Sequence, residues 1–155
     1  MGKGKKQKSR PYIAKNKRAR HDYEILDIFE AGIVLEGSEV KSLRQGAVNM
    51  SDAYAEIRGS ECFLVNLHIS PYQFSGVMNH EPKRDRKLLL HKQEIRRLMG
   101  KVKEKGLTLI PLSLYFKHGL VKVELALARG KRYHDKREDI RRRDEQRILE
   151  RDLKA

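Results

Sequence analysis

The composition of this chain changes abruptly at Gly130, and the change limits what each side can fold into. Between His21 and Gly130, apolar residues recur often enough to build a core. From Glu138 to the end, the only apolar side chains longer than alanine are Ile140, Ile148, Leu149 and Leu153. So few cannot offset the conformational entropy lost on folding. The last segment is therefore either a charged extension or a tail that becomes ordered on another molecule's surface.

The boundary stretch itself has the chemistry of an RNA contact. Lys131, Arg132, Lys136 and Arg137 supply positive charge around two flat rings, Tyr133 and His134. Flat side chains can stack on unpaired bases while cations meet the phosphates. This pattern favours a basic tail aimed at an RNA surface.

Net charge points to a polyanionic partner. The chain carries +14 over 155 residues, and residues 1–20 hold nine Lys or Arg and no acid. Such a concentration of cations favours nucleic acid ahead of a membrane. Lys6 stands where a myristoylation motif needs Ser or Thr, and no apolar run approaches spanning length. We therefore expect no membrane partner.

Cysteine and histidine usage indicates neither a disulfide framework nor a metal site. The single cysteine, Cys62, lies in an apolar alternation, so we expect a small buried hydrophobe in a reducing cytoplasm. The histidines lack ligand spacing such as H-E-x-x-H. No cofactor is expected.

Hydrophobic periodicity predicts one mainly β domain with short helices. Ala31 and Gly32 interrupt the long first strand, and a glycine there indicates a bulge or bend. Ser38 is the expected N-cap of the first helix, which should stop at Gly46. The expected strands are 23–35, 53–57, 62–67, 107–116 and 120–128, with helices at 38–46 and 92–105 and a long connection at 70–86.

These elements suggest an α+β fold built on an OB-like small β-barrel, with an open sheet and two packed helices as the alternative. In the last strand, Val121, Val123, Leu125 and Leu127 alternate with Lys122, Glu124 and Ala126. One face of that strand should be core and the other solvent-exposed. We expect a disordered basic arm at 1–17, the RNA-binding barrel at 18–130, and the tail at 131–155.

Six blocks in this order resemble the SsrA-binding protein family (small protein B), the bacterial partners of transfer-messenger RNA. They are 16–21 (NKRARH), 29–32 (FEAG), 39–44 (EVKSLR), 86–90 (RKLLL), 112–115 (LSLY), and 130–132 (GKR) with 134–137 (HDKR). The resemblance implies an OB-type barrel that binds the tRNA-like domain of transfer-messenger RNA. It also implies an adaptor of trans-translation that has no catalytic activity and delivers this RNA to stalled ribosomes.

By motif position, the resemblance implies a set of contacts with the tRNA-like domain. The residues are Asn16, Lys17, Arg18, Arg20, His21, Glu30 and Leu89. A glutamate can accept hydrogen bonds from a base amino group or a 2′-hydroxyl, so Glu30 fits this role, although a surface salt bridge is an equal alternative. Leu89 can pack on an exposed base only if it points outward, and the strand pattern by itself favours a core position.

For the tail, the resemblance implies contacts with small-subunit RNA at the decoding centre of the ribosome. These residues are Lys131, Arg132, Tyr133, His134, Asp135, Lys136 and Arg137. Asp135 and Glu138 have capping-box spacing, so we expect the tail to be helical when bound to the ribosome. Elongation factor Tu and alanyl-tRNA synthetase are expected to act on the same RNA.

Two other functions remain as alternatives. A small basic ribonuclease could use His134 with Asp135, or His21 with Glu30, but such pairs need a concave site and a positioned second partner. A different basic ribosomal or RNA-binding protein would share the charge pattern. Co-purification of a discrete tRNA-like RNA would separate the adaptor from the second alternative.

Overall fold

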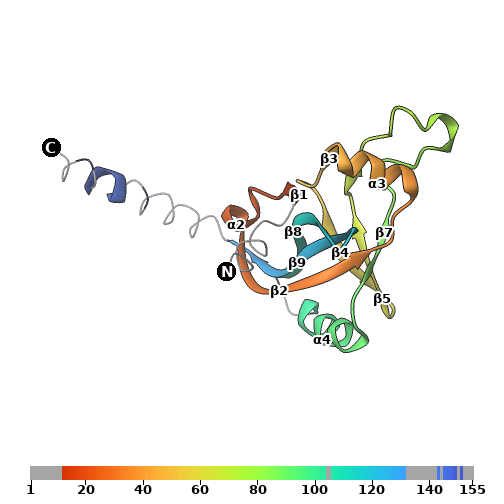
Figure 1. Cartoon of the computed structure of the whole chain (residues 1–155). Helices are drawn as coiled ribbons and strands as arrows, with labels where there is room; N and C mark the ends of the chain where they lie inside the picture. Colours follow the sequence, from red (N-terminus) through yellow and green to blue (C-terminus); the bar gives the residue numbers. More distant parts are fainter. Residues whose placement is uncertain (1–11, 104–105, 132–142, 144, 150, 152–155) are drawn as a thin grey trace, which may run out of the picture.

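The computed structural model describes residues 12–103, 106–131, 143, 145–149 and 151 (Figure 1). Our expectations for residues 1–11 and 132–137, including His134, lie outside the described residues.

Seven strands form one antiparallel sheet with the neighbour order β1-β8-β4-β5-β7-β2-β9. They are β1 (Tyr12–Lys15), β2 (Tyr23–Ile33), β4 (Tyr54–Arg58), β5 (Glu61–Val65), β7 (Arg86–Leu89), β8 (Leu107–Lys117) and β9 (Leu120–Gly130). Because β9 also pairs with β8, the six strands other than β1 are joined into a ring. The mainly β fold is confirmed, and the ring of pairings agrees with the OB-like expectation rather than with an open sheet.

The remaining elements connect the strands of this ring. They are α2 (Ala19–Asp22), α3 (Gly37–Arg44), α4 (Lys92–Val102), the 3₁₀ turn η1 (Gly76–Met78), and the two-stranded sheet of β3 (Val48–Asn49) and β6 (His68–Ile69). Figure 1 shows α3 and β3 at one end of the ring and α4 at the opposite end. Ile95 and Leu98 of α4 are buried, as the predicted apolar face requires.

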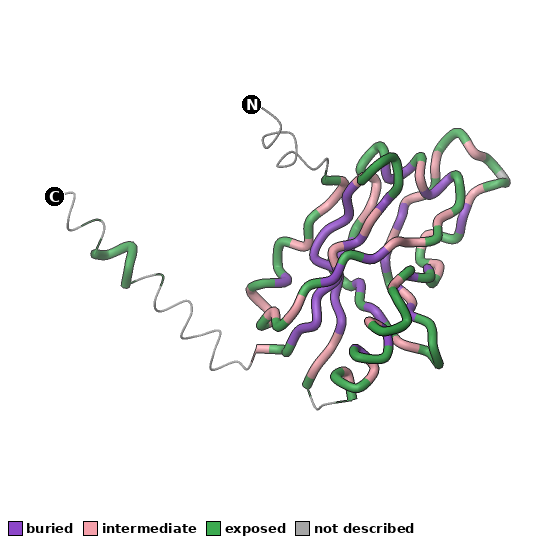
Figure 2. The backbone as a smooth tube through the Cα atoms, turned by 60° about the horizontal axis from the view of Figure 1, so that its bottom comes forward, coloured by how far each residue is buried: buried purple, intermediate pink, exposed green. Residues whose placement is uncertain are grey.

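The core follows the predicted alternation of β9. Val121, Val123, Leu125 and Leu127 are all buried, and Figure 2 shows buried residues along the strands in the middle of the molecule. Cys62 is fully buried there, and burial raises the pKa of its thiol to about 11. The prediction of Cys62 as a small buried hydrophobe is confirmed.

The other face of β9 is not solvent-exposed along its whole length, so that expectation was wrong in part. Ala126 and Ala128 are fully buried in a second, smaller cluster with Ala19, Ile110 and others. Ala19 belongs to α2, whose packing the alternation of β9 alone could not reveal. Small side chains on the strand allow the helix to approach closely.

The long strand β2 changes partners where the sequence predicted an interruption. It pairs with β9 from Tyr23 to Gly32, and at Gly32 and Ile33 it also pairs with β7. The register shift lies elsewhere, between Ile25 and Asp27. The bulge expected at Ala31 and Gly32 is therefore misplaced, although Gly32 does lie where β2 gains its second neighbour.

The predicted basic arm includes a strand that the sequence did not indicate. Tyr12–Lys15 form β1, which pairs with β8. The sequence offered only Tyr12 and Ile13 as bulky apolar residues. The edge of β8 supplies backbone hydrogen-bond partners that composition cannot indicate.

Helix α3 begins with a capping box rather than with the predicted Ser38. The N-cap is Glu36, and the Glu39 carboxylate accepts a hydrogen bond from the Glu36 backbone at 2.8 Å. The Ser38 hydroxyl instead pairs with Nδ1 of buried His80 at 2.8 Å. The predicted stop at Gly46 agrees with the structure, where Gly46 has φ +70° just past the helix.

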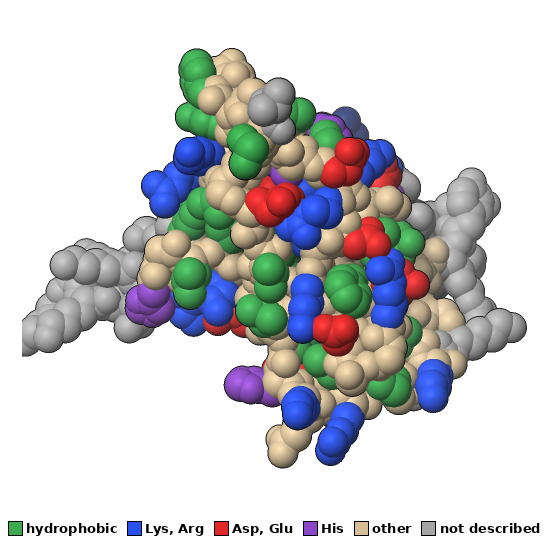
Figure 3. Space-filling model, turned by 90° about the vertical axis from the view of Figure 1, so that its right-hand side faces the viewer, with side chains coloured by type: hydrophobic (Ala, Val, Ile, Leu, Met, Phe, Trp, Pro, Cys, Tyr) green, Lys and Arg blue, Asp and Glu red, His purple; other side chains and the backbone are tan. Residues whose placement is uncertain are grey.

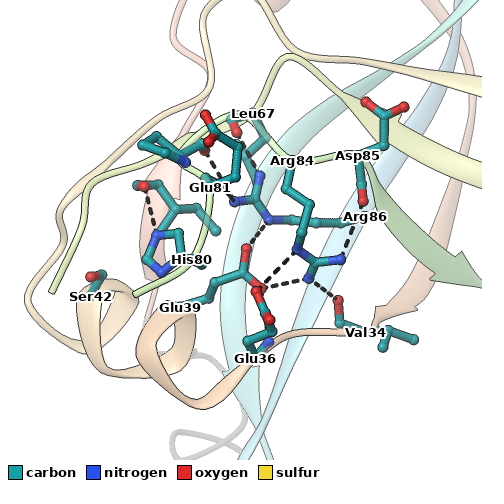
Figure 4. A network of polar contacts seen from close by, with 12 residues as sticks. Val34, Glu36, Glu39, Ser42, Leu67, His80, Glu81, Arg84, Asp85 and Arg86 are labelled. Carbon is teal, nitrogen blue, oxygen red and sulfur yellow. Dashed lines mark hydrogen bonds and ion pairs between the residues drawn. The ribbon is translucent and has the colours of Figure 1, made fainter. Parts of the chain in front are cut away.

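A buried ion network attaches α3 to the start of β7 and to the segment just before it. The Glu39 carboxylate lies between Arg84, at 2.6 Å, and Arg86 (Figure 4). Arg86 also donates hydrogen bonds to the carbonyls of Leu67 and Pro82, at 2.6 and 3.1 Å. The end of the long 70–86 connection is therefore fixed to the ring.

Candidate nucleic-acid interface

The strand register places predicted contact residues in two rows across the outer face of the sheet. In antiparallel pairs, directly opposite residues lie side by side on one face. The first row is Leu89, Gly32, Lys122, Tyr115 and Tyr12, and the second is Glu30, Glu124, Ser113 and Lys15. The rows cross β7, β2, β9, β8 and β1. They join Glu30 and Leu89 to the strand that leads into the basic segment at 16–21.

Glu30 lies at the middle of this face as a stabilised anion. Its carboxylate accepts hydrogen bonds from the Tyr115 hydroxyl at 2.5 Å and from Lys117 Nζ at 3.1 and 3.2 Å. The hydrogen bond from Tyr115, assisted by Lys117 and opposed by partial burial, lowers the pKa of Glu30 below its ordinary value. The salt bridge left as an alternative for Glu30 is present. The Glu30 side chain nevertheless remains 36% exposed.

Leu89 points outward, which the sequence pattern had disfavoured. Its neighbour Leu88 is buried, whereas Leu89 is 52% exposed. Gly32 lies directly beside it: a Cβ at that position would be 3.2 Å from Leu89 Cβ. Leu89 also lines a mostly apolar hollow with Leu120 and Lys122.

The predicted residues 16–21 cover two pieces of the structure. Residues 16–18 form the link from β1 to α2, and residues 19–21 belong to α2. Asn16 fixes the link by donating hydrogen bonds from its backbone to Leu112 O at 2.8 Å and from its amide to Pro111 O at 3.2 Å. A register shift between Pro111 and Ser113 accompanies this contact. Proline has no N–H for a strand partner and tends to lie at such bulges.

The cations of this segment are exposed. Among the described residues, no carboxylate pairs with Lys15, Lys17, Arg18 or Arg20. His21 is different because its Nδ1 lies 3.0 Å from Asp22 Oδ1. The link therefore presents positive charge available to a polyanion.

A hollow joins these cations to the rows. Lys17 and Arg20 line it from the link and the helix, and Ser113 and Glu124 line it from the sheet. Glu124 is the cross-strand neighbour of Glu30. The structure thus brings the link and Glu30 onto one continuous surface, with Leu89 toward its far edge.

The tail begins beside the same surface. The Lys131 backbone N–H donates to Asp22 O at 2.9 Å, which places the start of the tail next to His21. The other predicted tail residues, Arg132, Tyr133, His134, Asp135, Lys136 and Arg137, lie outside the described part of the chain.

The sequence missed Lys15 and Lys117 on this face, and also Tyr115, which is buried beneath the face and donates a hydrogen bond to Glu30. The outward positions of β9 were readable from its alternation, but the register that places Tyr115 beside Lys122 was not. The structure gives no support to a ribonuclease that would use His21 with Glu30. His21 pairs with Asp22, whereas Glu30 is held by Tyr115 and Lys117.

Charges elsewhere on the molecule are arranged differently. Figure 3 shows a face on which Lys or Arg and Asp or Glu side chains lie beside one another. On β5 and β7, Lys87 Nζ lies 2.6 Å from Glu61 Oε2, and Arg58 of β4 pairs with Asp85 at 2.8 Å. Each of these positive charges is therefore largely neutralised by a neighbouring carboxylate.

Within the described residues, no helix has the length and apolarity needed to cross a membrane. No group of three or more His, Cys, Asp or Glu side chains there could hold a metal ion.

Comparison with known proteins identifies the family. The family model described as SmpB protein matches residues 13–155. The SsrA-binding protein of Trichodesmium erythraeum (strain IMS101) is 57% identical over 143 residues, 92% of each chain. That of Syntrophobacter fumaroxidans (strain DSM 10017 / MPOB) is 62% identical over 139 residues, 90% of this chain and 86% of the relative.

A solved structure agrees with these relatives. It is described as "tmRNA-SmpB: a journey to the center of the bacterial ribosome" and matches with TM-score 0.67 and 54% identity, over 83% of this chain and 94% of the other. On the strength of these matches, this chain belongs to the SmpB protein family.

Proposed function

We propose that this protein is an RNA-binding adaptor of trans-translation, which binds the tRNA-like domain of transfer-messenger RNA and delivers it to stalled ribosomes. The relatives named SsrA-binding protein and the tmRNA-SmpB structure support this function. The carrying observation in this chain is the pair of rows that joins Leu89 and Glu30 to the basic link.

The chemistry of this surface suits a folded RNA. Lys17, Arg18 and Arg20 can neutralise phosphates, which supplies strength without sequence choice. The exposed Glu30 carboxylate can accept from a base amino group or a 2′-hydroxyl, and Leu89 can pack on an unstacked base. Asn16 is fixed by the sheet, so its role is to hold the cations in place as well as to contact RNA.

In the same proposal, the tail acts on the ribosome. Lys131, Arg132, Tyr133, His134, Asp135, Lys136 and Arg137 would occupy the empty decoding site, where no codon pairing is available. The position of Lys131 beside α2 supports a tail that departs from the RNA-binding face. Elongation factor Tu and alanyl-tRNA synthetase would act on the same RNA, in the cytoplasm.

The test compares cations on two surfaces. Lys17→Gln with Arg20→Gln should weaken binding of a tRNA-like transcript, measured by filter binding across a salt series. Each phosphate that the variant no longer neutralises should reduce the slope of log affinity against log salt by roughly 0.7 to 0.9. The control is Lys87→Gln, whose ammonium already pairs with Glu61. Equal effects from both changes, or equal wild-type binding to an unstructured strand of the same length, would contradict the proposed interface.

A further inference from the structure

A second hollow lies beside the β1–α2 link, and most of its lining belongs to neither of the two rows. Its volume is about 340 Å³, within the range of roughly 300–1,000 Å³ typical of ligand pockets. Its lining combines the end of β1 and the link with β3 and the turn that follows β3, and it includes Lys15, Lys17, Arg18, Val48, Asn49 and Met50. The turn after β3 was not among the sites predicted from the sequence.

The turn holds the Asn49 amide in one orientation. Asn49 Oδ1 accepts hydrogen bonds from the Ser51 backbone N–H at 3.0 Å and from the Ser51 hydroxyl at 2.8 Å. Because the backbone N–H can only donate, the amide oxygen must face Ser51. The amide NH₂ is then left without an acceptor among the described residues, and Asn49 is exposed. A fixed, unused donor therefore lies at the hollow.

The lining suits a nucleotide better than a bare phosphate. Ala14, Val48 and Met50 give it an apolar wall, against which a base can pack. Lys15, Lys17 and Arg18 give it cations that no carboxylate pairs with in the described part of the chain. A simple ion would use only these cations. An unstacked nucleotide would use the wall, the cations and the Asn49 donor together.

We propose that this hollow binds one unpaired, unstacked nucleotide of the RNA, with Asn49 donating to its base or ribose and the link cations near its phosphate. The inference rests on the proposed RNA-binding function and extends it to a residue on the far side of the link. Because Lys15, Asn16 and Lys17 line both hollows, the bound RNA lies on both sides of the link.

Asn49→Asp tests the site while preserving the turn. Aspartate keeps the oxygen that accepts from Ser51 but loses the amide donor and adds a negative charge facing the RNA. Ser51→Asp is the second variant, because it adds the same charge at the rim and, although it removes the hydroxyl donor, keeps the backbone N–H that donates to Asn49 Oδ1. Gln93→Glu is the control, since it makes the same amide-to-carboxylate change on exposed α4, at the opposite end of the ring from β3 (Figure 1).

We expect Asn49→Asp and Ser51→Asp to bind a tRNA-like transcript roughly tenfold more weakly than Gln93→Glu. Chemical probing of unpaired bases should show one nucleotide that wild-type protein protects and both variants expose, with the rest of the footprint unchanged. If all three variants bind alike with identical footprints while wild type binds normally, the nucleotide site is rejected but the proposed RNA-binding function is not. If wild type fails to bind the folded RNA, the proposed function is overturned with it.

Discussion

Replacing Glu39 with glutamine should cost this protein a large part of its stability. The Glu39 and Arg86 side chains are both fully buried, and Glu39 also binds Arg84 at 2.6 Å (Figure 4). Glutamine keeps the shape but leaves the buried Arg86 guanidinium without its counter-charge, while Arg84 keeps its contact with the more exposed Glu36. Breaking a buried pair in this way costs about 3–5 kcal/mol, against a total of roughly 5–15 kcal/mol for a typical domain.

Glu36→Gln is the matched control. Its side chain is 57% exposed and lies 3.4 Å from Arg84 Nε. An exposed pair of this kind contributes about 0–1 kcal/mol, and glutamine can still accept at the N-cap. Urea unfolding followed by circular dichroism at pH 7 compares the two variants. A Glu39→Gln midpoint equal to that of Glu36→Gln would refute the reasoning. Glu39→Leu combined with Arg86→Met should recover part of the loss, because no unpaired charge then remains at those two positions.

The same pair predicts a pH dependence with a definite sign. Burial opposes ionisation of Glu39, but hydrogen bonds from Arg84, the Glu36 backbone and Arg86 outweigh it, so the pKa of Glu39 lies below its ordinary value of 4.5. Its contribution is therefore complete above pH 4.5 and disappears as pH falls through the lowered pKa. The stability difference between wild type and Glu39→Gln should shrink in acid. A difference that stays constant down to pH 3 would show that the carboxylate charge is not responsible.

Three further predictions concern other parts of the chain. Cys62 is buried with a thiol pKa of about 11, so alkylation at pH 8 should be slow in native protein and rapid in urea; equal rates would contradict its burial. Leu89→Ala should weaken binding of tRNA-like RNA in a filter assay while changing the free energy of unfolding by less than ~1 kcal/mol, because the side chain is half exposed. A loss of several kcal/mol would mean that Leu89 belongs to the core. Deleting residues 131–155 should leave that RNA affinity nearly unchanged but abolish peptidyl transfer on ribosomes stalled without a codon. Loss of both activities would show that the tail itself contributes to binding of the tRNA-like RNA.

Local sequence patterns determined the parts of this protein that depend on neighbouring residues. The alternation of Val121, Val123, Leu125 and Leu127 predicted the core face of β9, and the spacing of Ile95 and Leu98 predicted the buried face of α4. The glycine at position 46 predicted the end of α3, and the structure gives Gly46 a positive φ. These features follow from the period of a strand or helix and from the freedom of glycine, so they can be read without knowing the partner.

Only the tertiary structure decided what depends on pairing between distant segments. The outward direction of Leu89 follows from its pairing with Gly32, and the burial of Ala126 follows from the packing of α2. Glu30 meets Tyr115, 85 positions along the chain, because β2, β9 and β8 share one register. Periodicity shows which side chains share a face, but it contains no information about which strand lies next to it or at what offset. The residues of the candidate RNA surface are brought together by the register between strands. The sequence could therefore suggest which residues contact RNA, but not that they lie side by side.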